Sequence, residues 1–483
     1  MGSDFFILKE RKQMDAILKI VQTINAYLSD YILIILLIGA GLFFSFKTRF
    51  VQVRCFGEGM KKVFGNLSLK GGKSESGLSS FQALATAIAA QVGTGNIVGA
   101  SGAILVGGPG AIFWMWIIAF LGMATIYAEA VLAQETRVID DDGQVHGGPV
   151  YYIKKAYNGA FGKFLMGFFA IATILALGFM GTMVQSNSIA ESCNTAFGIQ
   201  GWMVGLILAI ISAFIFLGGV SRLAAVTEKL VPVMACIFLL GGLFVIGIRI
   251  KYIPETFGMI FKYAFMPQAI IGGGIGMAIK TAISQGAKRG LFSNEAGMGS
   301  TPHAHAQANV EKPHDQGVVA MIGVFIDTFV VLTMTALVVI SCLYAGKGAM
   351  MVGEGDLITK TNAMQTAFGQ AMSVLFGESV GMTIGKMFIA ICLLFFAYST
   401  VLSWNFFGKI NVQFLFKNSK VATVIYSIIA IGFIFLGTLL SNDLVWELTD
   451  FFNYLMVIPN VLALVPLCAI VAKASKSNDK KLK

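Results

Sequence analysis

The feature that most constrains this chain is a series of long apolar segments. A helix that crosses the hydrocarbon core of a bilayer needs about 20 predominantly apolar residues, and its backbone polar groups must be satisfied within the segment. The segments that meet this requirement are 29–47, 79–106, 109–135, 161–188, 201–219, 229–248, 268–301, 317–345, 380–408, 421–440 and 446–472. We therefore predict an all-α polytopic membrane protein with eleven transmembrane helices in a lipid bilayer.

The composition supports this class and argues against others. Of the 483 residues, 56% are hydrophobic and only 12% are charged, whereas about a quarter of the residues of soluble proteins are charged. The 55 glycines against 9 prolines suit closely packed helices better than a β-barrel. We interpret the net charge of +10 as a topology signal rather than as a sign of nucleic-acid binding. The six cysteines form no CxxC pair, and no pattern predicts an organic cofactor.

The distribution of Lys and Arg predicts the orientation. Basic residues are concentrated in 47–73, in 137–163 and after 472, and they are fewer in the connections on the other side. Under the positive-inside rule the N-terminus is outside and the C-terminus is cytoplasmic, in a plasma membrane of the bacterial inner-membrane type. The segment Met1–Asp30 does not resemble a removable signal peptide.

Four connections are long enough to form helices of their own. The mixed apolar and basic stretch 50–67 predicts an amphipathic helix at the membrane interface. Stretches 253–265 and 350–376 predict short helices over the outer mouth, and 147–157 is a similar candidate on the inside. None of these connections contains a catalytic pattern, so we expect all four to be structural.

Internal symmetry organises the remaining helices. When the first helix is set aside, ten remain, and two sets of five must enter the membrane from opposite sides, as in an inverted repeat. The predicted parts are 1–78 with the extra helix and the amphipathic connector, 79–248 and 249–472 as the two repeats, and 473–483 as a basic cytoplasmic tail.

Both opening helices of the repeats are interrupted by glycine and polar residues. The first contains Gln91–Gly99, and the second contains the stretch from Gly286 to Ser300. Such residues weaken a helix, and irregular backbone at membrane depth persists where it lines a cavity or holds a ligand. A glycine motif for close helix packing is the alternative explanation for the first stretch alone. Interruptions at corresponding positions in both repeats favour a central transport site.

Five motifs identify a resemblance. The stretches GTGNIVG at 93–99, GGPGAIFWMW at 107–116, YAEAVLA at 127–133, KRGLFSNEAGMGS at 288–300 and FFAYSTVLSW at 395–404 resemble the alanine or glycine:cation symporter family, and the similarity covers nearly all of 30–472. The resemblance implies a leucine-transporter-like fold with one extra helix before the ten-helix core. It also implies sodium-driven import of small neutral amino acids.

The first interruption can be interpreted as a binding site for two ligands. Its amides at Gly93, Thr94 and Gly95 suit a substrate carboxylate, because the following half-helix directs its positive end at the gap. The carbonyl groups near Ala89 and Val92 suit a sodium ion, which prefers oxygen ligands.

The resemblance adds further site residues. It places Ser399 and Thr400 beside the carbonyl groups as sodium ligands, and it makes Asn96 an amide of the kind that contacts a second sodium in related transporters. It also matches Gln185 and Trp404 to positions that line the pocket. For Gln185 the alternative is an interhelical hydrogen bond, and for Trp404 it is a place in the interfacial aromatic belt.

The second interruption provides the opposite wall. We expect unwound carbonyl groups at Phe292 and Ser293 to accept from the substrate ammonium, with Asn294 beside them. A pocket bounded by Trp404, Phe292 and Met298 would admit a methyl side chain but not a large one. The charges of this segment have two alternative roles, a direct part in gating or a structural ion pair such as Arg289 with Glu295.

Other ionisable residues within apolar segments are Glu129, Lys280, Asp327 and Lys386. Asp327, next to Thr328, is the most suggestive proton relay, although pairing with a neighbouring helix is the commoner role. His303, His305 and His314 lie near one another in sequence, but without cysteine or a patterned carboxylate they do not predict a metal site.

These observations predict a sodium-coupled symporter that works by alternating access and is not an enzyme. The alternative coupling ion is the proton. A channel would need polar groups along the whole length of the helices, and an integral membrane enzyme would need an acid and base pair or a metal cluster. Neither pattern is present in the sequence.

Overall fold

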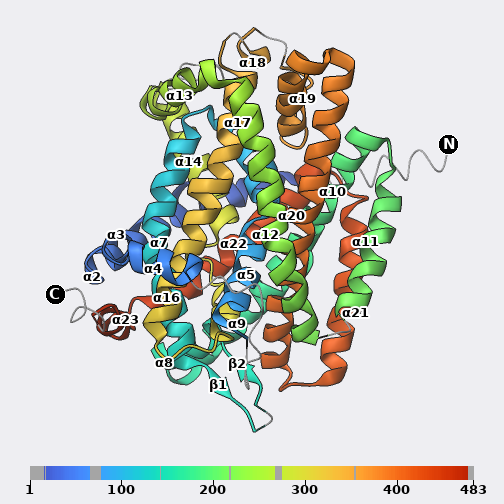
Figure 1. Ribbon diagram of the computed structural model, residues 1–483. Helices are drawn as coiled ribbons and strands as arrows, with labels where there is room; N and C mark the ends of the chain where they lie inside the picture. Colours follow the sequence, from blue (N-terminus) through green and yellow to red (C-terminus); the bar gives the residue numbers. More distant parts are fainter. Residues whose placement is uncertain are drawn as a thin grey trace.

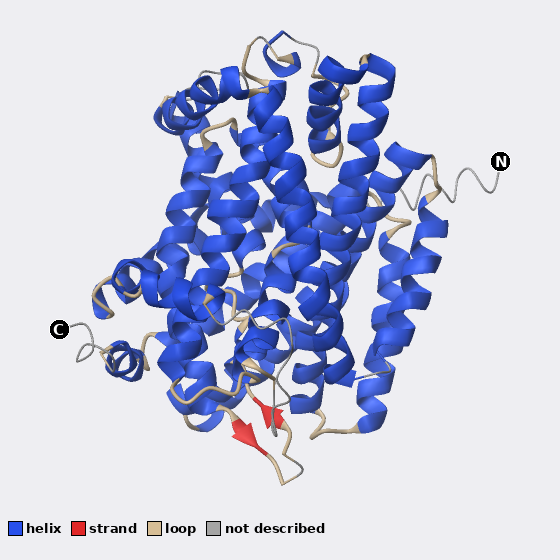
Figure 2. Ribbon diagram, viewed as in Figure 1, coloured by secondary structure: helices blue, strands red, loops and turns tan. Residues whose placement is uncertain are grey.

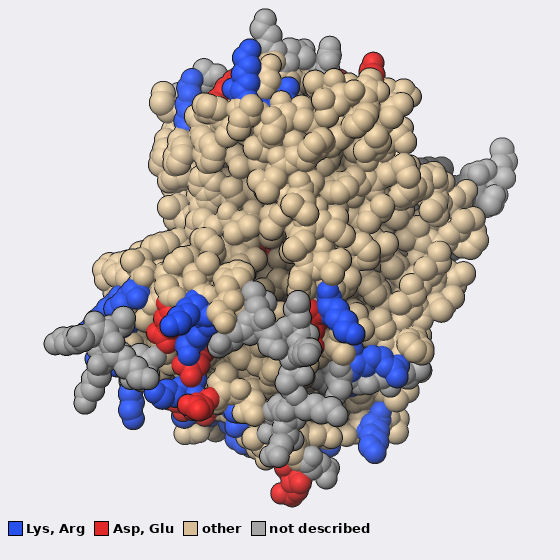
Figure 3. All heavy atoms as spheres, viewed as in Figure 1, with Lys and Arg blue, Asp and Glu red and all other residues tan. Residues whose placement is uncertain are grey.

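The computed structural model describes residues 16, 18–65, 78–141, 143–216, 219–266, 275–346, 348–352 and 355–476. Helices dominate these residues (Figure 2), and the only strands that they contain form a short hairpin at one end of the bundle. Charged side chains on the face shown in Figure 3 gather toward the two ends of the molecule, with a wide uncharged band between them. This distribution is the one expected of a helical bundle whose middle lies in hydrocarbon.

The N-terminal part forms one long apolar helix and two short ones. Residues Leu18–Lys47 are helical throughout, and they include the π-helical turn η1 (Leu28–Leu33) and α2 (Ile34–Lys47). The helices α3 (Val51–Arg54) and α4 (Phe56–Phe64) follow. The predicted amphipathic helix over 50–67 is therefore two helices, and positions 66–67 lie outside the described residues. Phe50 has a positive φ of 54°, which bends the backbone between α2 and α3.

The first predicted repeat contains five helical segments, of which two include π-helical turns. Its elements are α5 (Ser80–Gln91), η2 (Gly95–Gly99), α6 (Ala100–Gly107), α7 (Ala111–Thr136), α9 (Gly159–Thr173), η3 (Ile174–Gly181), α10 (Thr182–Phe197), α11 (Gly201–Phe216) and α12 (Gly219–Ile248). A capping box begins α5, because Ser79 Oγ accepts from the Gln82 amide and Gln82 Oε1 accepts from the Ser79 amide.

The first long helix of the second predicted repeat (249–472) is α14, which starts at Ile275. Residues 267–274, where the predicted segment 268–301 begins, lie outside the described part of the chain. From there on, the helical elements of this part of the chain are α14 (Ile275–Asn294), α15 (Pro302–Ala306), α16 (Pro313–Val324), η5 (Phe325–Leu332), α17 (Thr333–Leu343), α20 (Glu378–Leu415), α21 (Lys420–Gly437), α22 (Asn442–Leu464) and α23 (Cys468–Ser475).

The connections form small elements at the two ends of the bundle (Figure 1). At one end lie η4 (Ile250–Tyr252), α13 (Ile253–Phe265), α18 (Ala349–Val352) and α19 (Ala363–Phe376), and at the other lie β1 (Val138–Ile139), β2 (Val145–His146) and α8 (Pro149–Ala156). The helices expected over 253–265, 350–376 and 147–157 are confirmed in outline. The prediction of an all-α chain missed the antiparallel hairpin, which pairs Val138 with His146. A turn closes it, in which the Gly143 amide donates to the Asp140 carbonyl oxygen.

Seven helices among the described residues are long and apolar enough to cross a membrane, and the number rises to nine when two bent pairs each count as one span. The bent pairs are α5 with η2–α6, at 44°, and α22 with α23, at 72°. The shorter α11 is also apolar, and α14 carries Lys280, Lys288 and Arg289. The count of eleven spans, the five-plus-five repeat and the boundaries of the four parts stay predictions. Positions 477–483 of the tail lie outside the described residues.

Candidate functional site

The first helix break lies where the glycine-rich stretch predicts it. The helix α5 ends at Gln91, the backbone leaves helical geometry at Val92 (φ −81°, ψ 87°), and the π-helical turn η2 begins at Gly95. The Gly93 amide donates to Asn96 Oδ1 at 3.0 Å, and the Thr94 amide donates to Gln185 Oε1 at 3.1 Å. Two of the three amides expected to bind a carboxylate therefore contact side-chain oxygens that carry no full charge.

Three buried polar atoms around this break lack a hydrogen-bond partner among the described residues. They are Gln91 Oε1, Thr94 Oγ1 and Gln185 Nε2, and all three residues are at most 1% exposed. Buried polar side-chain atoms in folded proteins are nearly always paired, and each unpaired one costs about 1–3 kcal/mol. Atoms of this kind, gathered around irregular backbone at membrane depth, mark a place where a polar ligand would supply the missing partners.

The second break is shorter than the predicted window. The helix α14 continues through Asn294, and only the backbone from Glu295 to Thr301 is irregular before α15 begins. The sequence placed the break only within the window from Gly286 to Gly299, and the irregular backbone begins at Glu295, inside that window. Gly286 serves close packing, since a Cβ added there would lie 2.6 Å from Trp114 Cβ on α7. Phe292 and Ser293 occupy the last helical turn of α14, so their predicted unwinding is wrong.

Carboxylates hold the second break in place. Glu129 of α7 accepts from the Gly297 and Gly299 amides at 3.0 Å each, and from Asn460 Nδ2 at 2.6 Å. Both glycines have positive φ, at 90° and 80°. A backbone in this region favours glycine, so the sequence GMG at 297–299 and the buried Glu129 together fix the path of the chain.

Glu295 itself adopts a positive φ of 60° at the start of the break. Its carboxylate accepts from Trp404 Nε1 at 2.5 Å and from the Ser300 hydroxyl. The ion pair between Arg289 and Glu295, considered from the sequence, is wrong. Arg289 pairs with Asp450 of α22, with 2.8 Å between Nη2 and Oδ2, because Arg289 lies more than a helical turn before the break and faces α22.

The two breaks contact each other directly. Gln91 Nε2 donates to the Asn294 carbonyl oxygen at 2.7 Å, and a Cβ on Gly95 would lie 3.0 Å from Ser293 Cα. Asn294 Nδ2 reaches Thr328 Oγ1 at 3.3 Å. The predicted site residues of the two repeats are therefore brought together at one place in the bundle.

Asp327 of η5 lies between the two breaks. Its carboxylate accepts from Asn96 Nδ2 at 2.6 Å, from Ser293 Oγ at 2.9 Å and from Thr328 Oγ1 at 2.8 Å. The residue is fully buried. From the sequence, Asp327 was predicted only as a proton relay. An ionisable residue inside an apolar segment indicates a functional position, but the sequence does not show which helices this residue contacts.

The expected sodium ligands lie on facing helices. The Ala89 carbonyl oxygen of α5 lies 2.9 Å from Thr400 Oγ1 and 3.4 Å from Ser399 Oγ, both on α20. Thr400 Oγ1 also lies 3.4 Å from the Ala90 carbonyl oxygen. A Cβ added to Gly93 would come within 2.3 Å of Thr400 Oγ1, so Gly93 adjoins the same hydroxyl, and the Val92 carbonyl oxygen stays a predicted ligand. Oxygen atoms from both helices thus converge where a hard cation is expected.

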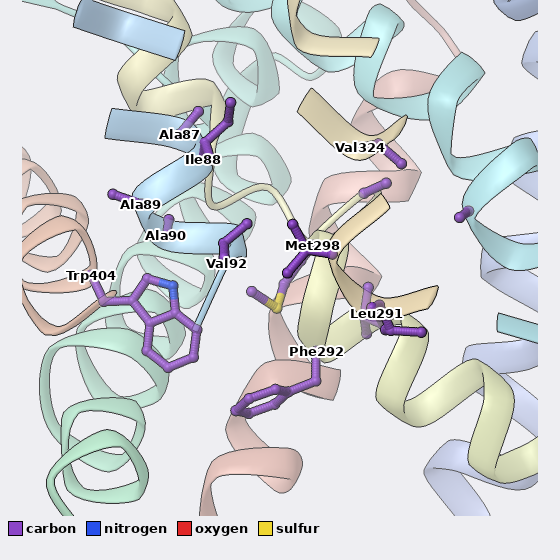
Figure 4. Close-up of a cluster of buried hydrophobic side chains, with 14 of the residues drawn as sticks. Ala87, Ile88, Ala89, Ala90, Val92, Leu291, Phe292, Met298, Val324 and Trp404 are labelled. Carbon is purple, nitrogen blue, oxygen red and sulfur yellow. The ribbon is translucent and has the colours of Figure 1, made fainter. Parts of the chain in front are cut away.

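The three predicted wall residues belong to the same buried cluster as Val92, the residue that follows α5. Figure 4 shows Trp404, Met298 and Phe292 arranged around Val92. The Phe292 and Trp404 rings meet edge to face, with 5.7 Å between centroids, and Trp404 is 1% exposed. The alternative of an interfacial belt position for Trp404 is therefore wrong, because the ring is enclosed by protein. Gln185 does make the interhelical hydrogen bond that was its alternative role, because its side-chain oxygen accepts from the Thr94 amide.

Comparison with known proteins gives the family. The family described as "Sodium:alanine symporter family" matches residues 14–483. The sodium/alanine symporter AgcS of Methanococcus maripaludis is 40% identical, over 95% of this chain and 96% of that protein. The putative sodium/proton-dependent alanine carrier protein YrbD of Bacillus subtilis is 39% identical, over 96% of this chain and 93% of that protein. The probable sodium/glutamine symporter GlnT of the same organism is 36% identical, over 96% and 91%.

Solved structures support the fold. The crystal structure of MhsT in complex with L-phenylalanine has a TM-score of 0.56 at 14% identity and covers 83% of this chain and 98% of that one. The manganese transporter of Eremococcus coleocola, in complex with an aromatic bis-isothiourea compound, has a TM-score of 0.54 at 13% identity and covers 83% and 86%. These neighbours are leucine-transporter-like, as the motifs led us to expect. The family and its neighbours are transporters rather than enzymes, and this chain belongs to the sodium:alanine symporter family.

Proposed function

We propose that the protein is a sodium-coupled symporter that imports small neutral amino acids, alanine and glycine, by alternating access around the two helix breaks. This proposal is carried by the buried atoms at the first break that have no hydrogen-bond partner within the described part of the chain, Gln91 Oε1, Thr94 Oγ1 and Gln185 Nε2. A zwitterionic ligand offers both an acceptor and a donor, so it can satisfy such atoms without leaving a buried charge unpaired.

The carboxylate of the substrate binds at the amides of Gly93, Thr94 and Gly95. In the structure, Gln185 Oε1 accepts a hydrogen bond from the Thr94 amide. A carboxylate is the stronger acceptor, because hydrogen bonds to an ionised group are roughly twice as strong as neutral ones. When the Gln185 amide rotates, its oxygen leaves the Thr94 amide and its Nε2 donates to the bound carboxylate. Asn96, which accepts from Gly93, adjusts in the same way.

The ammonium group of the substrate faces the end of α14. Phe292, Ser293 and Asn294 form the last turn of this helix, where carbonyl groups without an intrahelical partner and the negative end of the helix dipole favour a cation. Phe292, Met298 and Trp404 then enclose the side chain of the substrate. Because they leave little room, a methyl group or a hydrogen is preferred over a larger side chain.

Sodium binds between α5 and α20, with oxygen ligands from Ala89, Val92, Ser399 and Thr400. The hydroxyl groups and the Ala89 carbonyl already lie within hydrogen-bond distance, so small shifts suffice to direct their oxygens at one ion. Sodium and substrate contact the same broken helix. Each ligand therefore stabilises the backbone geometry that the other requires, and this shared requirement is the source of coupling.

The proton is the second candidate for the coupling ion. A relative that is 39% identical is named a putative sodium/proton-dependent alanine carrier, and the buried Asp327 contacts residues of both breaks through Asn96 and Ser293. The substrate range has a second candidate as well, since another relative is named a probable sodium/glutamine symporter. The Ala89–Thr400 oxygen cluster favours sodium, and the enclosure by Trp404 favours a small side chain.

We also propose the orientation derived from the basic residues. The end of the bundle that carries β1, β2 and α8 would face the cytoplasm, and the end that carries α13, α18 and α19 would face outward (Figure 1). This places the C-terminus inside and the N-terminus outside a plasma membrane.

Uptake into proteoliposomes tests the function. Purified protein is reconstituted, and radiolabelled alanine is supplied with an inward sodium gradient, with an inward proton gradient, or with neither. The proposal expects concentrative uptake with the sodium gradient alone, and competition by glycine but not by glutamine. Uptake driven by the proton gradient in sodium-free buffer would replace sodium as the coupling ion.

A further inference from the structure

Three side chains of metal-ligand type meet at the junction of α4 and α16. Cys55 immediately precedes α4, Glu58 lies in the first turn of α4, and His314 lies in the first turn of α16. The Cys55 Sγ, a Glu58 carboxylate oxygen and a His314 ring nitrogen all lie within 4.8 Å of one another. From the sequence we expected no metal at the histidines, because no cysteine and no patterned carboxylate accompany them in the chain. The fold supplies both, from a segment 256 residues earlier.

The orientation of His314 suits a metal ligand. Its Nδ1 lies 2.7 Å from the Tyr127 hydroxyl, and its Nε2 lies 3.3 Å from Glu58 Oε2. A metal-bound histidine usually donates its other ring N–H to an oxygen, which fixes the tautomer and the ring plane. Tyr127 is fully buried and is itself held by α16, since a Cβ on Gly317 would lie 2.7 Å from its ring. The Nε2 atom is therefore the ring nitrogen directed at Glu58, one of the other two candidate ligands.

The neighbouring charges permit a cation. Lys62 lies 3.9 Å from Glu58 but 3.0 Å from Asp315, so it keeps its nearer partner when Glu58 turns to a metal. Arg54, the residue before Cys55, donates from its guanidinium to the backbone carbonyl oxygens of Thr48 and Ser475. Cys55 lies at the N-terminal end of α4, where the helix dipole favours the thiolate that a metal requires.

We propose that Cys55, Glu58 and His314 form a three-ligand site for a divalent metal of the zinc class, which ties α4 to α16. Thiolate, imidazole and carboxylate together are the ligand set of zinc, and three protein ligands leave a fourth position for water. Zinc bonds of about 2.0–2.3 Å place neighbouring ligand atoms about 3.3–3.8 Å apart. The Glu58–His314 distance already fits, and side-chain rotation closes the rest. The ion reaches the buried thiol past Glu58, which is 25% exposed.

The site is separate from the proposed sodium and substrate sites, and its occupation has a structural consequence. The helix α16 continues into η5, which holds Asp327 against Asn96 and Ser293. A metal that joins α4 to the start of α16 therefore braces the element that connects both helix breaks. We expect bound zinc to raise the melting temperature of the protein and to slow transport.

Cobalt titration of the purified, reduced and chelator-treated full chain tests the site. Co²⁺ in a site with a thiolate ligand gives a near-ultraviolet sulfur-to-metal charge-transfer band and strong visible bands, and Zn²⁺ should displace it at one equivalent. The substitution Cys55→Ser is expected to abolish the charge-transfer band, and Glu58→Gln and His314→Gln to weaken affinity at least tenfold. The matched control is Cys342→Ser, which changes another buried cysteine and should leave the titration unchanged.

A second readout keeps the test independent of transport. Zinc is expected to raise the melting temperature of the parent and of Cys342→Ser but not that of Cys55→Ser. If His314→Gln does not fold because Tyr127 loses its partner, Cys55→Ser and Glu58→Gln still decide the matter. A cobalt spectrum that is unchanged by Cys55→Ser, or that shows only the weak bands of octahedral cobalt, would overturn the proposal.

Discussion

The two helix breaks differ in how their polar groups are satisfied. At the second break, Glu129 accepts two backbone amides and Glu295 accepts from Trp404 and Ser300. Apart from the Thr301 hydroxyl, its described side chains have partners. At the first break, uncharged side chains contact the amides, and three buried polar atoms lack partners among the described residues.

From this difference we infer that the second break is a structurally fixed segment and that the first break is the ligand-binding site. Each of the two carboxyl groups accepts at least two hydrogen bonds, so the second break has a fixed shape without any ligand. The first break is incomplete alone, and the missing partners are those that a zwitterion and a cation provide. Glycine-rich sequence predicts both breaks equally, and only the surrounding side chains distinguish their roles.

The largest effect is expected from Gly93→Ala at the first break. The new Cβ would lie 2.3 Å from Thr400 Oγ1 and 3.2 Å from Gln185 Oε1, so it would push apart the groups proposed to bind sodium and substrate. Alanine uptake should fall to background while the protein still folds. The matched control is Gly99→Ala, whose Cβ would find its nearest neighbour at 3.7 Å and should retain uptake. Equal uptake by both variants would mean that the first break is not the ligand-binding site.

A substitution at the second break should lower the stability of the protein more than it lowers transport. Glu129→Leu leaves the Gly297 and Gly299 amides buried without an acceptor, and each such group costs about 1–3 kcal/mol. We expect a loss of about 3 kcal/mol, measured by chemical or thermal unfolding in detergent. Glu129→Gln keeps one carbonyl acceptor and should lose about half as much. A fully stable Glu129→Leu variant would contradict the inference that hydrogen bonds to Glu129 fix the shape of the second break.

A smaller and more specific effect is expected from Thr400→Val, which removes one proposed sodium ligand while keeping the side-chain shape. The sodium concentration for half-maximal uptake should rise about tenfold, which corresponds to about 1.4 kcal/mol. Maximal uptake at saturating sodium should change little. Ser403→Ala on the same helix removes a hydroxyl that bonds the Thr86 carbonyl instead, and it serves as the control. A similar sodium shift in Ser403→Ala would remove the special role of Thr400.

The smallest effect is expected from Gln185→Leu. The variant loses the Nε2 donor proposed for the substrate carboxylate, but it also frees the Thr94 amide from its present acceptor. These changes partly offset each other, so the KM for alanine should rise about three- to tenfold, as the loss of one hydrogen bond of about 0.5–1.5 kcal/mol implies. The sodium requirement should stay the same. A change in sodium requirement with an unchanged KM would move Gln185 to the cation site.

The sequence was sufficient for the helical membrane class, the location of the first break and the family. Long apolar segments and a glycine cluster carry that information locally, because span length and helix weakening depend on neighbouring residues. The same local information placed the second break only within the window from Gly286 to Gly299, and the unwinding expected at Phe292 and Ser293 was wrong. Gly286 lies inside α14, where it allows close packing against Trp114 of α7.

Long-range polar pairing could not be derived from the sequence. Arg289 meets Asp450, Glu129 meets Gly297, and Asp327 meets Asn96, and each pair joins elements far apart in the chain. An ionisable residue in an apolar segment signals that a partner exists, but the partner depends on how the helices pack. The cluster of Cys55, Glu58 and His314 was missed for the same reason.

The most direct test of the central claim is the affinity of the purified protein for alanine with and without sodium. If both ligands bind at the first break, saturating sodium should tighten alanine binding about 5- to 150-fold, the usual range of coupling between sites. Alanine should tighten sodium binding by the same factor, and Thr400→Val should reduce both effects. Equal alanine affinity in sodium and in a sodium-free buffer of the same ionic strength would contradict the account.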